Sequence, residues 1–563
     1  MRRPIAILLA AAALVAGCGT DAPDTPGARS PAPVCDAELD RAFRAWADAG
    51  FSGSVAVTTG GEPDCLAAYG LADRDADRPN TVDTVFAIGS VSKAFTAAAV
   101  LDLVDAGRLT LSDRAGDLVP GLTGPAAGVT VEQLLLHTSG LTGSHGQDHE
   151  PLSRATAVAA IGRLDLAFEP GSDFLYSNAG YTLLALVVEA ASGRPYRDQM
   201  AAEILPLPGG DVAGGFWDGE PAAPGPRAVG YGDAGPTDEI GDFGGPHWAL
   251  AGNGDLAMTM GELADWTHAL FTGHIVGPGA VGLLDRLRFD QGDGTAEAPG
   301  WVAVNAPAFG EPVLTTAGGG GDVRHDTVVA WLPESERVVA IASNAPDVTA
   351  GELLRAVGPA LVAGDPLPTP DVAGDVDPAD AAAVAGTYRL GTGGSYEVGA
   401  GDGRRLAIAA RGADAVSALF PPPDVVAPGD VAAHERAVAS LLAGETPLGR
   451  EERAALESQL GPIGRIELAG TVLEDGELHT YVTVEAAGVP LLAWYTLDEA
   501  GGVGAAELGV EPPTLLVGSS GGELGFRPDD PTGAGPDVTV AFADGGLTVT
   551  GPDGATTTAR STG

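Results

Sequence analysis

A serine and a lysine three positions apart are the first residues in this sequence whose types could carry a reaction. They are Ser90 and Lys93, and Lys93 is the only lysine among 563 residues, since Lys and Arg together number 30 and 29 of these are arginines. Arginine cannot release its proton in a protein, whereas a desolvated lysine can act as a base. The pair predicts a serine nucleophile beside an amine, although a serine three positions before a lysine arises by chance about once in fifteen cases.

The segment that contains this pair predicts a helix over residues 90–106, which Gly107 ends. Residues three apart share one face of a helix, so Ser90 and Lys93 are expected to lie together. Almost every face of the helix is apolar, which predicts that it is buried and that the amine is desolvated. At the start of a helix, free backbone N–H groups can stabilise an oxyanion.

Tyr176 and Asn178 form a second candidate group, in front of the apolar run over residues 179–188. A plain interpretation is that Ser177 or Asn178 caps the helix that this run predicts. The other interpretation is chemical, because a tyrosine beside Lys93 can carry a proton when the positive charge stabilises its phenolate. The residues alone leave both interpretations open.

S-x-x-K at residues 90–93 together with Y-x-N at residues 176–178 resembles the serine β-lactamase family in its class C-like branch. That branch of penicillin-recognising serine hydrolases also holds D-alanyl-D-alanine carboxypeptidases, D-aminopeptidases and esterases. Residues 131–141 and 250–256 are similar to further segments of the family. The likeness covers roughly residues 34–364.

The resemblance implies a role for each motif residue. Ser90 is expected to form an acyl-enzyme, and Tyr176 to take the Ser90 proton and return it to the leaving group. Asn178 is expected to orient the substrate amide and Lys93, while His137 is expected to be structural rather than a base. No metal or cofactor is implied, and the expected partner is a small-molecule or peptide substrate, with cell-wall peptides among the candidates.

The third motif of the family departs from its pattern in this chain. The family has Lys or His, then Thr, Ser or Gly, then Gly, and the best register here is residues 316–318, with Thr316 in the place of the cation. Gly318 still permits a close approach of the backbone. The N–H of Gly319 is expected to complete an oxyanion hole with that of Ser90.

A neutral residue at position 316 changes the expected substrate. A carboxylate-bearing penicillin or D-Ala-D-Ala peptide loses its cationic partner, unless Arg324 or His325 supplies one. An esterase or peptidase is therefore favoured over a true β-lactamase. A non-catalytic or impaired penicillin-binding or sensor lipoprotein on the same fold stays open as the alternative.

The elements that must position these motifs predict an α+β domain. Helices are predicted over residues 36–49 and 351–362, and two hairpins over residues 52–59 with 65–71 and 326–332 with 337–343. Terminal helices on an antiparallel sheet, with a mostly helical middle, are an α+β arrangement. The β-lactamase and transpeptidase-like fold of the resembling family matches it.

Beyond this domain the composition changes. Residues 365–380 are rich in Pro and Asp and are expected to form a linker. Residues 381–563 predict a mainly β domain, a small barrel or sandwich, with an α+β segment at about residues 430–508. No catalytic cluster is evident in it, and a packing or substrate-gating role is expected.

The N-terminus predicts export. Two arginines precede an apolar run over residues 5–15, which is too short to span a bilayer and is typical of a signal peptide over residues 1–17. The run ends in L-V-A-G-C, similar to a bacterial lipobox, so Cys18 is expected to be lipidated and residues 18–33 to form a tether. An ordinary signal peptide with a chance cysteine is the alternative. The expected location is the extracytoplasmic face of a bacterial membrane.

The other two cysteines and the charge complete these expectations. Cys35 and Cys65 are expected either to pair as a disulfide, as an oxidising compartment allows, or to be buried free thiols. His145 and His149 are four apart in a polar stretch, which favours a solvated loop over a metal site. The formal charge of −46 argues against nucleic acid, and membrane contact is expected only through the lipid anchor.

Overall fold

The computed structural model describes most of the chain from Val34 to Thr562. The described ranges are 34–147, 151–232, 235–236, 247–292, 294–304, 309–320, 323–401, 404–423, 426, 428–474, 477–486, 488–497, 502–521, 524–531 and 535–562. The predicted signal peptide, Cys18 and the tether lie outside these ranges, as does His149.

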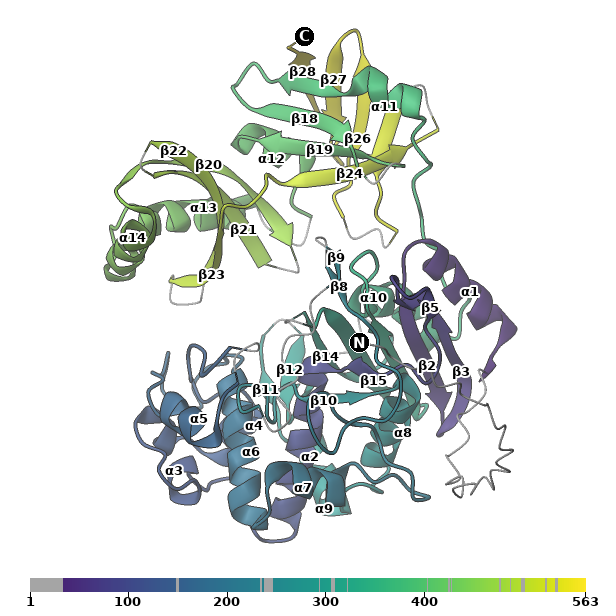
Figure 1. The fold of residues 1–563 in the computed structure, drawn as a ribbon, viewed down its shortest axis with the longest axis vertical. Coiled ribbons are helices and arrows are strands. Elements are labelled where there is room, and N and C mark those ends of the chain that lie inside the picture. The colour runs from purple at the N-terminus through teal and green to yellow at the C-terminus, as the bar shows by residue number, and fades with distance from the viewer. Residues whose placement is uncertain are drawn as a thin grey trace, which may run out of the picture.

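The first domain is built on a nine-stranded antiparallel sheet (Figure 1). The order is β1 (Val34–Cys35), β3 (Glu62–Tyr69), β2 (Gly53–Thr59), β16 (Arg337–Ser343), β15 (His325–Leu332), β14 (Val313–Gly320), β13 (Trp301–Val304), β12 (Thr295–Ala298) and β11 (Phe289–Asp290). The predicted hairpins are β2 with β3 and β15 with β16. The predicted α+β class is confirmed.

Helices cover both faces of this sheet. The terminal helices α1 (Ala37–Asp48) and α10 (Ala350–Ala363) lie on one face of the sheet. They share a core with the strand residues that point to that face, such as Val55. The next residue along β2, Ala56, belongs to the larger core on the opposite face, because successive strand side chains point to opposite faces. That larger core is formed mainly by helices of the middle of the chain, namely α2 (Ser92–Asp105), α3 (Ala115–Leu118), α4 (Val131–Leu135), α5 (Arg154–Ile161), α6 (Asn178–Ser192), α7 (Tyr196–Gln199), α8 (Met260–Phe271) and α9 (Pro278–Arg286).

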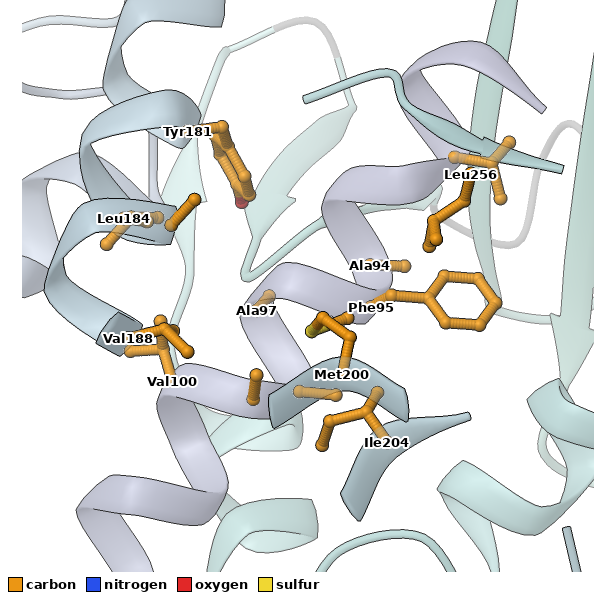
Figure 2. Packing of buried hydrophobic residues seen from close by; sticks show 14 of the residues in the cluster. Ala94, Phe95, Ala97, Val100, Tyr181, Leu184, Val188, Met200, Ile204 and Leu256 are labelled. Carbon is orange, nitrogen blue, oxygen red and sulfur yellow. The ribbon is translucent and has the colours of Figure 1, made fainter. Parts of the chain in front are cut away.

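The helix predicted over residues 90–106 forms as a 3-10 turn, η1 (Gly89–Val91), followed by α2. Figure 2 shows side chains of α6 and of the π-helical turn η3 (Met200–Ile204) converging on α2. On another side of α2, Phe95 stacks on Trp266 of α8 with 3.5 Å between ring centroids. Burial on all sides holds the start of α2, and with it the serine and lysine, in a fixed position.

Short strands join the loops around this core. They are β4 (Leu71–Asp73), β5 (Arg78–Pro79), β6 (Phe86–Ala87), β7 (Gly215–Phe216), β8 (Tyr231–Gly232), β9 (Gly235–Pro236) and β10 (Leu256–Met258), with the 3-10 turn η2 (Pro125–Gly128). At the far edge of the sheet, Cys35 of β1 pairs with Cys65 of β3, and the structure joins the two by a disulfide. Of the two alternatives for these cysteines, the structure contains the bonded one.

The second region contains a closed β-barrel and an inserted α+β layer (Figure 1). The barrel is formed by β17 (Gly386–Arg389), β18 (Ser395–Ala400), β19 (Leu406–Arg411), β24 (Thr514–Ser519), β25 (Gly525–Pro528), β26 (Thr539–Ala543), β27 (Gly546–Thr550) and β28 (Thr556–Ser561), with α11 (Pro378–Val384) before it. Between β19 and β24 come α12 (Ala413–Leu419), α13 (Pro428–Leu442), α14 (Pro447–Leu460), β20 (Ile463–Glu474), β21 (Glu477–Ala486), β22 (Val489–Leu497) and β23 (Val503–Leu508). The α+β segment is therefore an insertion in the barrel.

Candidate active site

Ser90 lies in the middle of η1, and the backbone of β14 packs closely against this turn. A Cβ added to Gly318 would lie 2.2 Å from the backbone nitrogen of Ser90 and 2.4 Å from the carbonyl oxygen of Ile88. Gly89 has a φ of +48°, and a Cβ there would lie 3.2 Å from the nitrogen of Gly319. Glycine at these positions lets the strand and the turn approach closely enough to bring Ser90 beside β14.

Lys93 lies one helical turn after Ser90 and is almost fully buried, with 3% of the residue exposed. Its Nζ donates to Ser90 Oγ at 2.8 Å, to Asn178 Oδ1 at 2.8 Å and to the carbonyl oxygen of Asn253 at 3.1 Å. Three acceptors match the three N–H donors of an ammonium group. The lysine is thus directed at the serine by its other two partners.

Tyr176 contacts the same oxygen of Ser90 as the amine does. Its hydroxyl donates to Ser90 Oγ at 2.7 Å, and Lys93 Nζ lies 4.6 Å from the centre of its ring. The residue is 48% exposed, and its hydroxyl contacts the serine. Partial burial raises the pKa of Tyr176 to about 12, while the hydrogen bond with Ser90 acts in the opposite direction. The resting phenol is therefore protonated at neutral pH.

The capping interpretation of the Y-x-N segment is confirmed for Ser177, and the chemical interpretation stays a prediction. Ser177 caps α6, because its Oγ accepts from the N–H of Gly180 at 3.2 Å. Asn178 is the first residue of the helix and points its Oδ1 at Lys93. The Ser177 cap fixes the start of α6. The residue before it, Tyr176, contacts Ser90, and the residue after it, Asn178, contacts Lys93.

His137 forms hydrogen bonds with the backbone of this segment. The N–H of Ser177 donates to its Nδ1 at 3.0 Å, and the N–H of Leu175 donates to its carbonyl oxygen at 2.9 Å. Its ring stacks on that of Tyr176, with 4.5 Å between centroids. Burial lowers the pKa of His137 well below its usual value, and the charge of Lys93 lowers it further. A neutral ring in contact with the loop agrees with the expected structural role.

β14 supplies the other wall of the site. Thr316 and Gly318 are buried, as alternate strand residues on one face are expected to be. Among the described strand pairs, β13 accompanies β14 only as far as Thr315, so the following residues have a free edge beside η1. The backbone nitrogens of Ser90 and Gly319 both lie close to the contact between η1 and β14.

The cation missing at position 316 is not supplied by His325. This histidine is 3% exposed, and its Nδ1 accepts from the N–H of Ala87 at 3.1 Å. Its ring packs between Phe86 and Trp217, and burial lowers its pKa to about 4. His325 is therefore neutral at ordinary pH and engaged behind the strand, whereas Arg324 is exposed at the turn before it.

The solvated loop predicted for His145 is wrong. The residue is 6% exposed, and its Nε2 lies 3.0 Å from the carbonyl oxygen of Trp248. Within the described ranges, no three His, Cys, Asp or Glu side chains gather as metal ligands would. The same part of the chain contains no helix long and apolar enough to cross a bilayer.

Two neighbours of Lys93 were not found from the sequence. Asn253 contributes its backbone carbonyl, while its Nδ2 donates to Thr182 Oγ1 and to the carbonyl oxygen of Ala249, both at 2.8 Å. Glu297 of β12 is 5% exposed, and the charge of Lys93 acts on its carboxyl. Asn253 lies in residues 250–256, which resemble a segment of the family, but the resemblance gave this residue no role. No sequence pattern pointed to Glu297.

Comparison with known proteins agrees with this geometry. The sequence model of the Beta-lactamase family matches residues 39–362, which is 324 of the 563 residues. The chain belongs to the Beta-lactamase family. Its first domain is therefore of the serine hydrolase kind to which β-lactamases and penicillin-binding proteins belong.

Three curated relatives show how far the similarity reaches. Penicillin-binding protein 4* of Bacillus subtilis (strain 168) is 34% identical over 168 residues, 28% of this chain and 37% of that protein. The putative penicillin-binding protein PbpX of the same strain is 30% identical over 229 residues, 40% of this chain and 56% of that protein. Esterase EstB of Burkholderia gladioli is 34% identical over 207 residues, 33% of this chain and 52% of that protein. The chain thus spans between about a third and somewhat over half of each of these relatives.

A solved structure is similar over most of the chain. The octameric penicillin-binding protein homologue from Pyrococcus abyssi superposes with a TM-score of 0.52 at 19% identity, covering 85% of this chain and 99% of that one. At this identity the likeness concerns the fold alone. Since 85% exceeds the share of the first domain, the shared fold extends into the C-terminal region.

Proposed function

We propose that this chain is an exported, lipid-anchored serine hydrolase in which Ser90 is acylated by an ester, an amide or a D-amino-acid peptide. The observation that carries the proposal is that Ser90 Oγ receives hydrogen bonds from both Lys93 Nζ and Tyr176 OH, at 2.8 and 2.7 Å. A weak nucleophile needs an adjacent group that can take its proton, and two such groups converge here on one oxygen.

In the first step, the Lys93–Tyr176 pair accepts the proton of Ser90 as a unit. The resting pair contains an ammonium with three acceptors and a protonated phenol, so the reactive state has one proton fewer, on either the amine or the phenol. Two groups that interact this closely share their titration, and neither has to be assigned as the sole base. Ser90 Oγ then attacks the carbonyl carbon of the substrate, and its proton passes to the pair.

The charge that develops on the carbonyl oxygen is stabilised by the N–H groups of Ser90 and Gly319. When the intermediate collapses, Tyr176 delivers a proton to the leaving group and the bond to that group breaks. In the second half of the cycle a water molecule takes the place of the leaving group. The pair accepts a proton from this water as its oxygen attacks the acyl carbon. When the bond between that carbon and Ser90 Oγ breaks, the pair returns the proton to Oγ and the acid leaves.

The walls of the site favour substrates without a carboxylate next to the scissile bond. Thr316 is neutral in the position where relatives with the full motif have a cation, and His325 is neutral and turned to other partners. Losing a hydrogen bond to a charged group costs about 1.5–3 kcal/mol, which corresponds to about 10- to 100-fold in rate. This supports an esterase or peptidase over a true β-lactamase.

Export and anchoring are proposed from the sequence of residues 1–33. An apolar run too short to span a bilayer and the L-V-A-G-C sequence support cleavage before Cys18 and lipidation of its thiol. Radiolabelled palmitate incorporated by the parent chain and not by the Cys18→Ala variant is the expected result. Equal incorporation by both would contradict the anchor.

Turnover of three chromogenic substrates tests the reaction class. The full chain, extracted in detergent, is assayed with p-nitrophenyl butyrate, D-alanine p-nitroanilide and a chromogenic cephalosporin, beside Ser90→Ala and the matched control Ser92→Ala. Ser92 lies in the same turn, but its hydroxyl accepts from the N–H of Leu256. We expect the parent and Ser92→Ala to hydrolyse the ester or the anilide. For the cephalosporin we expect a kcat/KM at least about tenfold lower than for the better of these two substrates.

A different outcome would favour the second candidate, a binding or sensor lipoprotein. The observation that keeps this candidate is the neutral Thr316, which weakens the grip on a substrate carboxylate. If the folded parent turned over none of the three substrates yet bound a fluorescent penicillin, the hydrolase proposal would be contradicted.

A further inference from the structure

Glu297 is a buried carboxyl beside the catalytic centre for which the reaction above has no use. It lies on β12, paired with Val302 of β13 and Phe289 of β11, and only 5% of it is exposed. Glutamate is rarely buried without a partner. Its Oε2 accepts from Gln291 Nε2 at 3.2 Å, and its Oε1 lies 3.9 Å from Nε2 of His137.

The strand that carries Glu297 is seated on the helical turn of Lys93. The turn between β12 and β13 contains Gly300, where an added Cβ would lie 2.6 Å from Cα of Ala94 and 2.8 Å from the carbonyl oxygen of Lys93. This contact fixes β12 relative to α2. The carboxyl of Glu297 is therefore held in a fixed position in the surroundings of the Lys93 amine.

The orientation of the His137 ring is determined by its other contacts. Because the N–H of Ser177 donates to Nδ1, that nitrogen is an acceptor. A neutral ring then has its proton on Nε2, which is the atom that faces Glu297. The same ring stacks on Tyr176, so the imidazole lies in contact with the tyrosine and faces the carboxyl through Nε2.

We propose that Glu297 and His137 form a positioning dyad for Tyr176, in which the carboxyl faces the Nε2–H of His137 as an electrostatic partner, too far away for a direct hydrogen bond, and its charge determines how readily the Lys93–Tyr176 pair loses a proton. The inference rests on the function proposed above. Glu297 contacts neither Ser90 nor the place of the substrate, so it acts through its neighbours. The dyad explains why a carboxyl is buried at this position of β12.

The charge effect follows from the groups that face Glu297. Among the described residues these are Lys93 of α2, His137, Tyr176, Tyr181 of α6 and Gln291. Burial raises the pKa of Glu297 to about 8, and the charge of Lys93 lowers it. When the carboxyl ionises, its charge raises the pKa of Tyr176 and favours the ammonium form of Lys93. Ionised Glu297 therefore makes the reactive state of the pair harder to reach.

The pH dependence of acylation in Glu297→Gln tests the charge effect. The full chain in detergent is labelled with a fluorophosphonate between pH 5 and 10, and the midpoint of the rising limb is compared with that of the parent. Glutamine has nearly the same shape as glutamate but never ionises, so we expect the midpoint to move down by about one pH unit. Glu262→Gln is the matched control, because Glu262 is a half-buried acid that belongs to the capping box of α8. An unchanged or higher midpoint in Glu297→Gln would overturn the charge effect.

Two further measurements separate positioning from the reaction itself. Glu297→Ala lacks the polar side chain that faces His137, and we expect it to label about tenfold more slowly than Glu297→Gln at every pH, with both variants folded. Nitrogen NMR of the histidine rings, with His137 assigned from His137→Asn, is expected to show the parent ring neutral with its proton on Nε2. A proton on Nδ1 would overturn the dyad. If the parent reacts with no probe at all, the proposed function fails, and the NMR result still decides the dyad.

Discussion

The proposed catalytic centre and the linker contact of the C-terminal barrel both contain a buried cation, but the hydrogen bonds around the two cations are arranged differently. At the centre, Lys93 and Tyr176 converge on one oxygen, that of Ser90. At the barrel, the guanidinium of Arg405 reaches outward to Asp375 of the linker, at 3.1 Å, and to Asp529.

This difference separates the two kinds of buried polar group. Groups that converge on a nucleophile prepare it for proton transfer, and leave its oxygen open to a substrate. A cation that spreads its hydrogen bonds over separate segments ties those segments together. Arg527 makes the same kind of contact with Asp371, at 2.7 Å. The barrel residues are therefore expected to affect stability, and the residues of the centre to affect reaction rate.

The largest expected effect is from Lys93→Arg, which preserves the positive charge but removes the amine that can lose a proton. We expect the rate of fluorophosphonate labelling to fall by about a thousandfold or more, because a guanidinium cannot be part of the proton-accepting pair. Circular dichroism checks that the variant is folded. A rate within tenfold of the parent would show that charge alone suffices.

Adding one methyl group to a glycine in each region, by Gly318→Ala near Ser90 and by Gly399→Ala in the barrel, compares how the two regions tolerate it. Its Cβ would lie 2.2 Å from the nitrogen of Ser90, so the strand or the turn must move and the oxyanion donors separate. We expect labelling to slow by about 100-fold, as for loss of one oxyanion donor, and stability to fall by about 1–3 kcal/mol. Gly399→Ala in β18 is the control, since nothing lies within 4 Å of its added Cβ. Equal effects of the two substitutions would break the comparison.

Arg405→Met tests the barrel side. The residue is 8% exposed, and its removal leaves Asp529 without its cation, at a cost of about 2–4 kcal/mol. We expect thermal unfolding of the barrel at a lower temperature, measured by calorimetry, with the labelling rate of Ser90 within twofold of the parent. A large loss of labelling would mean that the barrel acts on the site.

The smallest expected effect concerns the pH dependence of stability. The pKa of Glu297 is about 8 in the folded protein and lower in the unfolded chain, so its protonated form stabilises the fold at low pH and this contribution is lost as pH rises to 8. Glu297→Gln has no such loss. We expect its melting temperature, relative to that of the parent, to rise by a few degrees between pH 5 and 9. A constant difference over this range would contradict the raised pKa.

The sequence predicted those parts of the site that depend on local spacing. Ser90 and Lys93 lie on one face because a helix brings residues three apart together, and the apolar run after Asn178 correctly predicted α6. The hairpins were visible from alternation of apolar residues and from turn residues between them. These features are properties of short segments, which sequence patterns describe well.

The remaining parts depend on approaches between distant segments. The acceptor from Asn253 is a backbone carbonyl, which every residue has, so no residue type marks it. Glu297 comes near Lys93 only because the β12–β13 turn packs on α2. His325 was considered as a substitute cation because its type fits, and only its burial beside Phe86 shows that it is neutral.

The most direct test of the account is the intact mass of the protein after reaction with a fluorophosphonate. We expect one adduct on the parent chain and on Ser92→Ala, and none on Ser90→Ala, with all three proteins folded by circular dichroism. Undiminished labelling of Ser90→Ala, or no adduct on the folded parent, would contradict a nucleophilic Ser90.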